Sequence, residues 1–586
     1  MYPVWVGHYP GKKYWSSALP RTSLRLALRA ALWAAALCGS TIALPANADN
    51  GDDPCVTKRV GWPEAAERAR FAWPTITEAA AGTEIISSCL RLSDLGPLKT
   101  VAAEPAEAGS FSINGGAFLA SPQKIRNGDR VRARVRASSQ ADGRVALTAI
   151  FNAGLRLASF EVRTVNLPTN NRAATTYQVG PTRAIKQLTE IAPKLVAGDT
   201  VLVDAGVYAP VRFERAGTRA HPITIRGDSN SRPVISGGPY AVSFIGAHHT
   251  VFEHFEITDA RLACVFNQAH ELTLRALFIH DCNRHGILGA DLANGSNLIE
   301  YSELTRTGSH PIGENRKHPI YIATDRDAFP NARLRVQHSY LHNNIGESIK
   351  SRSARTEIYY NWIDVGVDAK SLYTLALYGF EVYRTADSLN SDVVGNVLVH
   401  RGRYGIRLGG DGTGDSKGRV RLANNTIILG PDFGQAPVIR LFQSIDSVYL
   451  INNAVIRSGG STDPVRMFRN DIEPSAWVGG RIKLAGVSNW LPPQSIIDPA
   501  PAHEWRMSIN GQALLRSMDM TAIDVTPQPD SALINGATSL RDIDSEYDIG
   551  DRLLVLERSI WPRAPVSGAR LTEYRRDTLR RNIGAY

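Results

Sequence analysis

Apolar residues recur in pairs along the second half of the chain, with the second member five positions after the first. The pairs are Phe252/Ile257, Leu274/Ile279, Ile299/Leu304, Val336/Leu341, Ile358/Ile363, Val393/Leu398, Leu422/Ile427 and Leu450/Val455. The shortest interval between successive pairs is 22 residues, and the longer intervals fit the same unit with residues added in loops. Such a unit is typical of a coil of short parallel strands, because each turn must close on itself.

In the later units an asparagine follows three positions after the first apolar residue. It is found at Asn361, Asn396, Asn425 and Asn453. Stacked asparagine side chains hydrogen-bond the backbone of adjacent turns at a bend, where asparagine also tolerates a left-handed conformation. The pattern therefore predicts a right-handed parallel β-helix over residues 172–460. A leucine-rich repeat is disfavoured, because its Leu-x-x-Leu-x-Leu spacing is missing.

Most units also contain a second short strand, in which two residues that face the core flank one that points outward. The triplets are 287–289, 320–322, 349–351, 375–377, 406–408 and 439–441. Because side chains alternate along a strand, the predicted outward row is Leu288, Tyr321, Lys350, Ala376, Arg407 and Arg440. Adjacent turns lie about 4.8 Å apart, so Tyr321 and Lys350 are predicted neighbours. Arg352 and Tyr378, two residues further along their strands, face the same side.

The remaining regions are less regular. Residues 96–166 contain short runs in which apolar and polar residues alternate between turns, and this pattern predicts a small antiparallel β-sandwich. Residues 49–95 mix polar turns with helical-looking pieces such as 63–70, and residues 461–586 are interpreted as the end of the coil and its cap. The expected fold class is therefore all-β, with the sandwich preceding the β-helix.

Residues 1–48 have the pattern of a secretory signal peptide. Five basic residues and no acidic ones precede the apolar run Ala30–Leu44, and the small-x-small sequence Ala46-Asn47-Ala48 follows it. Cleavage after Ala48 predicts a secreted or periplasmic protein with no membrane anchor. A retained anchor is the alternative, although the run is shorter than the roughly 18 apolar residues expected of a spanning helix.

The charge of the chain gives no support for a nucleic-acid partner. The formal net charge is +10, but five of the 66 basic residues lie in the leader, so 61 basic residues face 56 acidic ones in the rest. That excess is too small to indicate binding to nucleic acid.

Four cysteines follow the leader: Cys55, Cys89, Cys264 and Cys282. Their spacing fits no zinc motif, and an even number in an exported protein favours disulfides. The predicted pairs are Cys55 with Cys89 and Cys264 with Cys282. Burial of the last two as small apolar residues is the alternative.

The outward row is suited to an acidic sugar polymer, because sugars stack on aromatic rings and carboxylates pair with cations. Cleavage of such a polymer by β-elimination needs a base, a group that neutralises the carboxylate, and a proton donor for the leaving oxygen. Lys350 is the candidate base, and Arg352 and Arg407 are candidates for binding the carboxylate. Tyr321 or His318 is the candidate proton donor.

The other candidate substrate-binding residues surround this row. His285 opens the strand one turn before Tyr321, Glu347 is placed to orient Lys350, and Tyr378 and Arg440 share the outward face. For each candidate, a solvated or purely structural role is the alternative. The sequence has no recurrent acidic cluster for hydrolysis by two carboxylates or for a calcium cage, so no cofactor is expected, with calcium left open.

The chain resembles the pectate-lyase-like superfamily of right-handed β-helices, in which an opening such as Gly198-Asp199-Thr200 with Gly206-Val207-Tyr208 is common. Glu347-Ser348-Ile349-Lys350-Ser351, followed by Thr356, Ile358, Asn361 and Ile363, is similar to the catalytic-lysine turn of the alginate lyase and chondroitinase B family. This resemblance implies that Lys350 is the base. The arginine that assists the lysine in that family is not matched, since Tyr373-Thr374-Leu375-Ala376-Leu377-Tyr378 holds its place.

Residues 171–586 also resemble exported bacterial β-helix proteins of undefined activity. The shared segments are His318-x-Ile320-Tyr321-Ile322, Ile349-Lys350-Ser351-Arg352 and Asn582-Ile583-Gly584-Ala585-Tyr586.

The leading hypothesis is a secreted or periplasmic polysaccharide lyase-like enzyme that cleaves an acidic, uronate-containing polysaccharide by β-elimination. One alternative is a non-catalytic β-helix that binds an exopolysaccharide or guides its export. Another is a uronate epimerase or a glycoside hydrolase that uses the same surface.

Overall fold

The computed structural model describes residues 56–585 with gaps. The gaps are 60–70, 74–75, 80–81, 83, 88, 94, 139–143, 153–154, 165–171, 290–293, 309–316, 326–327, 330, 366–372, 378–388, 402–404, 411–417, 435, 443–444, 471–482, 498–504, 507–510, 539–560 and 573–581. The predicted signal peptide, the helical-looking piece at 63–70, Cys55 and Tyr378 therefore lie outside the described residues.

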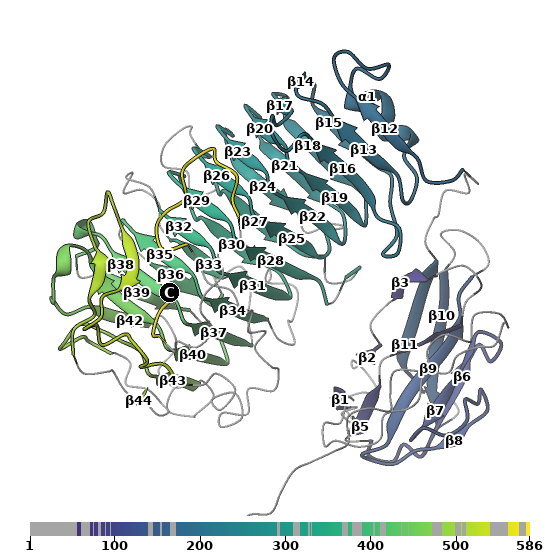
Figure 1. The fold of residues 1–586 in the computed structure, drawn as a ribbon. Coiled ribbons are helices and arrows are strands. Elements are labelled where there is room, and N and C mark those ends of the chain that lie inside the picture. Colours follow the sequence, from purple (N-terminus) through teal and green to yellow (C-terminus); the bar gives the residue numbers. More distant parts are fainter. Residues whose placement is uncertain are drawn as a thin grey trace, which may run out of the picture. The chain divides into compact units, whose positions relative to one another are not determined.

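Three parallel sheets build the coil, and each turn of the chain adds one strand to each sheet (Figure 1). Within the described residues, sheet I has 13 strands, and sheets II and III have ten each. This architecture is the predicted parallel β-helix.

Sheet I consists of β12 (Thr176–Val179), β13 (Thr200–Val203), β16 (Ile223–Gly227), β19 (Thr250–Glu253), β22 (Leu272–Arg275), β25 (Asn297–Glu300), β28 (Arg333–Gln337), β31 (Arg355–Tyr359), β34 (Asn390–Val394), β37 (Arg419–Ala423), β40 (Ser447–Ile451), β43 (Lys483–Val487) and β44 (Trp505–Arg506). Sheet II consists of β14 (Val207–Tyr208), β17 (Val234–Ser236), β20 (Glu256–Thr258), β23 (Phe278–His280), β26 (Glu303–Thr305), β29 (Tyr340–His342), β32 (Trp362–Asp364), β35 (Val397–His400), β38 (Thr426–Leu429) and β41 (Ala454–Arg457). Sheet III consists of β15 (Val211–Phe213), β18 (Tyr240–Ile245), β21 (Ala263–Gln268), β24 (His285–Gly289), β27 (Ile320–Ala323), β30 (Ile349–Arg352), β33 (Leu375–Leu377), β36 (Ile406–Leu408), β39 (Pro437–Leu441) and β42 (Arg466–Asn470).

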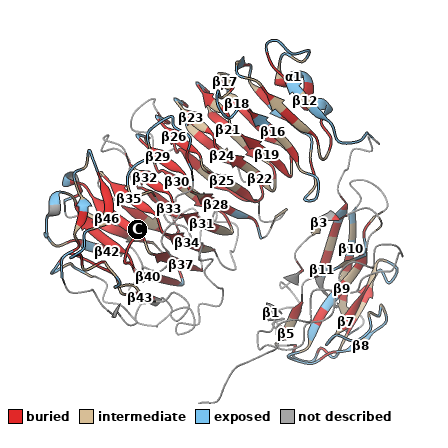
Figure 2. Cartoon of the chain, in the orientation of Figure 1, coloured by how far each residue is buried: buried red, intermediate tan, exposed pale blue. Residues whose placement is uncertain are grey.

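The paired apolar residues fill the interior of the coil. The first member of each pair lies on sheet I and the second on sheet II, and every member is at most 1% exposed. Figure 2 shows buried residues along the strands of all three sheets. Adjacent strands stack in register, so that Phe252 pairs with Leu274 and Leu274 with Ile299. The sequence spacing is thereby converted into a continuous apolar core.

The predicted asparagine ladder is present at the bend between sheets I and II. The Oδ1 atom of Asn396 accepts the backbone N–H of Asn361 at 2.8 Å, and the contact repeats through Asn425 and Asn453 to Asn489. Each ladder side chain is buried and bonds the turns on both sides. The left-handed conformation belongs to the residue before the asparagine, for example Tyr360 with φ 55°, and not to the asparagine itself. The ladder side chains therefore accept hydrogen bonds from backbone N–H groups at the bend, where the chain has left the sheets.

The Gly-Asp-Thr opening closes the first turn of the coil. Gly198 has φ +87°, a conformation that glycine adopts without strain. Asp199 is buried and accepts the backbone N–H groups of Thr175 and Val196, and it pairs with Arg172. Two short helices, α1 (Leu188–Ile191) and η2 (Ala192–Lys194), follow β12, and none of the described helices is long or apolar enough to cross a membrane.

Two sheets around one apolar core form the N-terminal sandwich. One consists of β1 (Val56–Arg59), β5 (Leu90–Ser93), β9 (Arg130–Arg136), β4 (Glu84–Ile86) and β7 (Gly109–Ile113). The other consists of β2 (Phe71–Ala72), β11 (Leu155–Thr164), β10 (Arg144–Phe151), β6 (Thr100–Glu104), β8 (Gln123–Lys124) and β3 (Ile76–Ala79). The sandwich therefore takes strands from residues 49–95, which the sequence analysis kept separate. Phe111 and Phe160, from different sheets, share its core with Trp73.

The C-terminal residues extend the coil and then pack on its side. The short helices η3 (Pro431–Phe433) and η4 (Ser458–Gly460) interrupt the last turns, and β42, β43 and β44 continue sheets I and III beyond residue 460. The hairpin β45 (Leu515–Ser517) and β46 (Asp524–Pro527), together with Ile583, packs against the outer face of sheet II (Figure 1). These segments were expected to cap the end, but apolar residues such as Trp362 on that outer face provide their contact surface.

Candidate functional site

The strand pairing of sheet III places the outward residues in one row. Tyr321 pairs with Lys350, Lys350 with Ala376, Ala376 with Arg407, and Arg407 with Arg440. This is the order that the repeat predicts. The pairings continue the row to Phe266 before Leu288 and to Arg469 after Arg440.

Lys350 and Tyr321 are in direct contact at the centre of this row. The Lys350 Nζ atom lies over the Tyr321 ring, 4.9 Å from its centroid. Both side chains are partly exposed, so both are accessible to a ligand that lies across sheet III. A cation over an aromatic face is stabilised by about 0.5–1 kcal/mol at such sites.

Two histidines lie beside this pair. The His318 ring is 5.6 Å from that of Tyr321, and the His285 ring is 5.7 Å from that of His318. Burial and the nearby charges of Arg284, Lys350 and Lys317 lower the pKa of His285 to about 4. The His285 Nδ1 atom accepts the backbone N–H of His318 at 3.3 Å, so the neutral ring carries its proton on Nε2.

His318 is more deeply enclosed than the sequence analysis expected of a proton donor. Its side chain is 2% exposed, and burial, followed by the charge of Lys350, lowers its pKa well below the ordinary value. Its Nδ1 atom has no hydrogen bond among the described residues and lies 3.6 Å from a Glu347 oxygen. His318 is therefore neutral and is placed beneath Tyr321, where it can support the ring but does not itself face solvent.

A glycine brings Glu347 to His318. Gly346 has φ +89°, and a Cβ atom on it would lie 1.6 Å from the Lys317 carbonyl oxygen. Only glycine fits so close to another backbone segment. The turn before β30 is therefore pressed against the segment that leads into β27, and Glu347 is buried there.

Arg352 differs from the predicted exposed cation. Strand alternation puts it on the same face as Lys350, and it pairs with Ala323 one turn earlier. Arg352 is nevertheless buried, with only 5% of its surface exposed. Its guanidinium group is therefore largely enclosed beside the row and does not form an exposed cation.

A second cluster holds Arg407 and Arg440. The guanidinium carbon of Arg407 is 3.7 Å from the Phe442 ring centroid, and that of Arg440 is 4.3 Å from it. The Arg440 Nη1 atom donates to the Tyr373 hydroxyl at 3.0 Å. Stacking on an aromatic ring restricts the orientation of each guanidinium group.

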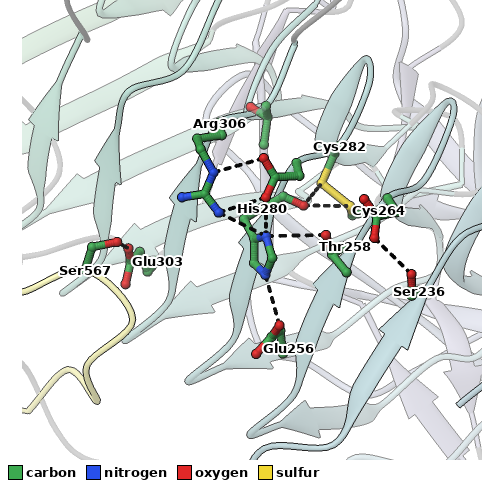
Figure 3. Close-up of polar contacts among 12 residues, drawn as sticks. Ser236, Glu256, Thr258, Cys264, His280, Cys282, Glu303, Arg306 and Ser567 are labelled. Atoms are coloured by element: carbon green, nitrogen blue, oxygen red, sulfur yellow. Dashed lines mark hydrogen bonds and ion pairs between the residues drawn. A yellow bond between two sulfur atoms is a disulfide. The ribbon is translucent and has the colours of Figure 1, made fainter. Parts of the chain in front are cut away.

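A separate polar cluster surrounds His280 on sheet II (Figure 3). The His280 Nε2 atom is 3.1 Å from Glu256, its Nδ1 atom is 2.6 Å from Asp281, and Arg306 binds Asp281. Arg306 compensates the charge of Asp281, and the contacts of the cluster tie adjacent turns together. In the part of the chain that the structure describes, no group of three or more His, Cys, Asp or Glu side chains is arranged to hold a metal ion.

One disulfide links neighbouring turns of the coil. Cys264 and Cys282 form a disulfide, as predicted, close to His280 (Figure 3). Cys89 is also disulfide-bonded, while its predicted partner Cys55 lies outside the described residues.

The sequence analysis missed the aromatic residues that support the row. Phe442 stands two positions after Arg440 and so shares its face, which strand alternation could have indicated. Phe266 was missed because its triplet Val265-Phe266-Asn267 ends in a polar residue. Tyr240, whose ring stacks on Phe266 with centroids 4.5 Å apart, lies off the repeat and carried no signal.

No protein-family model matches the chain. No curated protein matches it either. Among solved structures, it is similar to a pectate lyase, Pel9A, with 14% identity over 64% of this chain and 94% of that one, at a TM-score of 0.40. An alginate lyase from Paenibacillus sp. str. FPU-7 shares 16% identity over 53% of this chain and 99% of that one, at a TM-score of 0.33. A rhamnogalacturonan lyase shares 13% identity over 56% of this chain and 90% of that one, at a TM-score of 0.38.

Proposed function

We propose that this chain is a secreted or periplasmic polysaccharide lyase-like enzyme that cleaves a uronate-containing polysaccharide by β-elimination. The observation that supports it best is the contact of Lys350 with Tyr321 at the start of a run of outward cations on sheet III. A polyanion laid across the strands would meet one side chain of the row per turn, about every 4.8 Å.

In the proposed reaction, the neutral Lys350 amine takes the proton from the carbon next to the uronate carboxylate. The electron pair of that C–H bond forms a carbon–carbon double bond, and the C–O bond to the next sugar breaks. Tyr321 donates its hydroxyl proton to the leaving oxygen, so no water is consumed. The two residues are adjacent on neighbouring strands, which fits one group on each side of the bond that breaks.

The surrounding residues would stabilise and orient this pair. Arg352, buried on the same face, places a fixed positive charge near the carboxylate as negative charge develops on it. The stacked Arg407 and Arg440 would bind carboxylates of sugars further along the polymer. His285 would donate a hydrogen bond through Nε2, and His318 with Glu347 would position Tyr321.

Ultraviolet absorbance of unsaturated chain ends tests this proposal on a panel of uronate polymers. We expect product from the wild-type protein and a loss of about 10²- to 10⁴-fold in Lys350→Ala, the range for removal of a general base. Lys194→Ala, which changes an exposed lysine at the start of the coil, is the matched control and should retain full activity. Product at wild-type rate from Lys350→Ala would rule out the proposed base.

A second candidate is a non-catalytic β-helix that binds an acidic exopolysaccharide. The Lys350 Nζ atom lies over the Tyr321 ring as in a cation–π contact, and a lysine cation in such a contact can bind a carboxylate without any proton transfer. Tight polymer binding by the wild-type protein without unsaturated product would favour this candidate. An epimerase would also give no unsaturation but would change the uronate composition of the recovered polymer.

A further inference from the structure

Strand β9 of the N-terminal sandwich carries a row of cations that the proposed function does not use. Val131, Ala133 and Val135 face inward and are buried in the sandwich core, so the alternate residues point outward. These are Arg130, Arg132, Arg134 and Arg136, of which Arg134 is partly exposed and the others are exposed. Successive arginines are about 6.8 Å apart along the strand, which gives this arginine row a length of about 20 Å.

Little negative charge accompanies the arginine row. Among the five strands of this sheet, Glu84 is the one acidic residue, and it lies opposite Arg136. Asp129, the residue before Arg130, accepts hydrogen bonds from a side-chain amide and a backbone N–H. The side chains of Arg130 and Arg132 make no hydrogen bond or ion pair with the described residues. Their guanidinium donors are therefore available to a ligand.

The other sheet of the sandwich compensates its outward cations. Arg144 on β10 and Arg163 on β11 both pair with Glu161, at 2.5 and 2.6 Å. The two faces of one small domain therefore differ, because Arg130 and Arg132 have no such carboxylate among the described residues.

Protection of a sheet edge does not explain the arginine row. Charged residues often stop an exposed edge strand from pairing with another chain. β9 is not an edge strand, because it pairs with β5 and β4 on one side and with β7 on the other. The row does not stabilise the strand either, since four like charges along it repel one another.

The surroundings of the arginine row suit a sugar polymer. The Arg134 Nε atom donates to the Ser110 hydroxyl at 3.3 Å, and its guanidinium carbon is 4.8 Å from the Phe118 ring centroid. These contacts restrict the orientation of this guanidinium group. Ile86, opposite Arg134, is 50% exposed. A uronate sugar offers a carboxylate to the guanidinium groups and an apolar ring face to such a side chain.

We propose that the outer face of the sheet that contains β9 is a second binding surface for an anionic polysaccharide, whose carboxylates pair with the arginine row. A linear polymer fits this row better than a small anion, because a single carboxylate cannot span arginines about 6.8 Å apart. The predicted export of the chain favours a polysaccharide over a nucleic acid. The inference does not depend on the lyase reaction, since the sandwich takes no part in the chemistry proposed for Lys350 and Tyr321.

Affinity electrophoresis at low salt, through gels that contain galacturonan or mannuronan, tests this proposal. The full chain carries Lys350→Ala so that the polymer stays intact. Arg130→Gln together with Arg132→Gln should weaken binding about three- to tenfold, the effect of losing two exposed ion pairs. Arg144→Gln together with Arg163→Gln removes the same charge from the other sheet. This matched control should change binding by less than about twofold.

Three results would overturn the proposal. Equal losses in the two double variants would mean that the polymer responds to net charge alone. An unchanged affinity in Arg130→Gln/Arg132→Gln, or no retardation of the starting protein by either polymer, would remove the binding surface. Tighter binding of single-stranded DNA than of either polymer, lost in the same double variant, would overturn the assignment to a polysaccharide.

Product formation from short uronate oligosaccharides separates this surface from the proposed active site. With Lys350 restored, Arg130→Gln/Arg132→Gln should form unsaturated product at the wild-type rate. A loss of product as large as the loss of binding would place these arginines at the reaction and overturn a second surface. A wild-type protein that forms no product would reject the lyase, while the loss of polymer binding in the double variant would still support this proposal.

Discussion

The outer faces of sheets I and III place their charges in opposite ways. On sheet I the row Arg226, Glu253, Arg275 and Glu300 alternates in sign from turn to turn. Glu253 lies between its two arginines and pairs with both, at 2.5 and 3.1 Å. On sheet III the cations Lys350, Arg407, Arg440 and Arg469 follow one another along the same face without a carboxylate among the described positions of that row.

This difference separates stabilisation from binding. Opposite charges on neighbouring strands support a sheet, whereas like charges on neighbouring strands destabilise it. The alternating row therefore contributes to the stability of the coil, whereas the row on sheet III places like charges on neighbouring strands. Such a row attracts a polyanion, which fits the binding role proposed for sheet III.

The largest expected effect is a loss of stability when the buried ion-pair cluster of sheet I is disrupted. Asp392 pairs with Arg355, Arg419 and Arg421, and both Asp392 and Arg421 are 0% exposed. Burial alone would raise the pKa of Asp392, but its three arginines outweigh burial and hold the pKa below the ordinary value. Asp392→Asn leaves these cations uncompensated and should lower the free energy of unfolding by about 3–5 kcal/mol in urea titrations.

The exposed Asp530→Asn is the control for this change and should have no effect. A loss below about 1 kcal/mol in Asp392→Asn would show that sheet I does not depend on its ion pairs.

Acid should act first on the histidines beside sheet III and only later on sheet I. His285 has a folded pKa of about 4, so between pH 6.5 and 4 the unfolded chain binds a proton that the folded chain does not. Stability is fully present above pH 6.5 and falls as pH is lowered through this window, by about 1.4 kcal/mol per pH unit for each such histidine. Asp392, with its lowered pKa, adds to the loss only below its ordinary value of 3.8.

His285→Gln should reduce the slope of stability against pH in this window by about one proton. A slope remains, because the buried His400 has a pKa of about 3. The exposed His221→Gln is the control and should leave the slope as it is. An unchanged slope in His285→Gln would contradict a neutral, enclosed His285.

Removal of the stacked cation Arg440 should weaken polymer binding without changing the fold. Arg440→Gln should reduce binding of an anionic polymer at low salt by about tenfold, which corresponds to about 1.4 kcal/mol for a charged hydrogen-bonding partner. Arg212→Gln, on the same sheet but ion-paired with Glu214, should have little effect. Equal losses in both variants, measured by affinity electrophoresis, would indicate binding to net charge alone.

The smallest effect concerns stability at the centre of sheet III. Lys350→Ala removes a partly exposed cation and its contact with Tyr321, and we expect the free energy of unfolding to change by no more than about 1 kcal/mol. The same variant should lose product formation. A loss of stability as large as that of Asp392→Asn would mean that Lys350 is structural, and the contrast between the two sheets would fail.

The amino-acid sequence by itself determined the coil, the asparagine ladder and the order of the row from Leu288 to Arg440. It could do so because each turn adds one strand to each parallel sheet. Residues one repeat apart in the sequence therefore become neighbours on adjacent strands. The same stacking predicted that Tyr321 and Lys350 are neighbours. The Cys264–Cys282 disulfide was predicted from the even number of cysteines in an exported chain.

Only the tertiary structure decided which of these residues face solvent and what covers the coil. The burial of Arg352 and His318, the stacking of Arg407 on Phe442, and the packing of C-terminal segments on sheet II follow no repeat. They depend on long side chains and on segments far apart in sequence, whose contacts are chosen by shape and desolvation once the coil has formed.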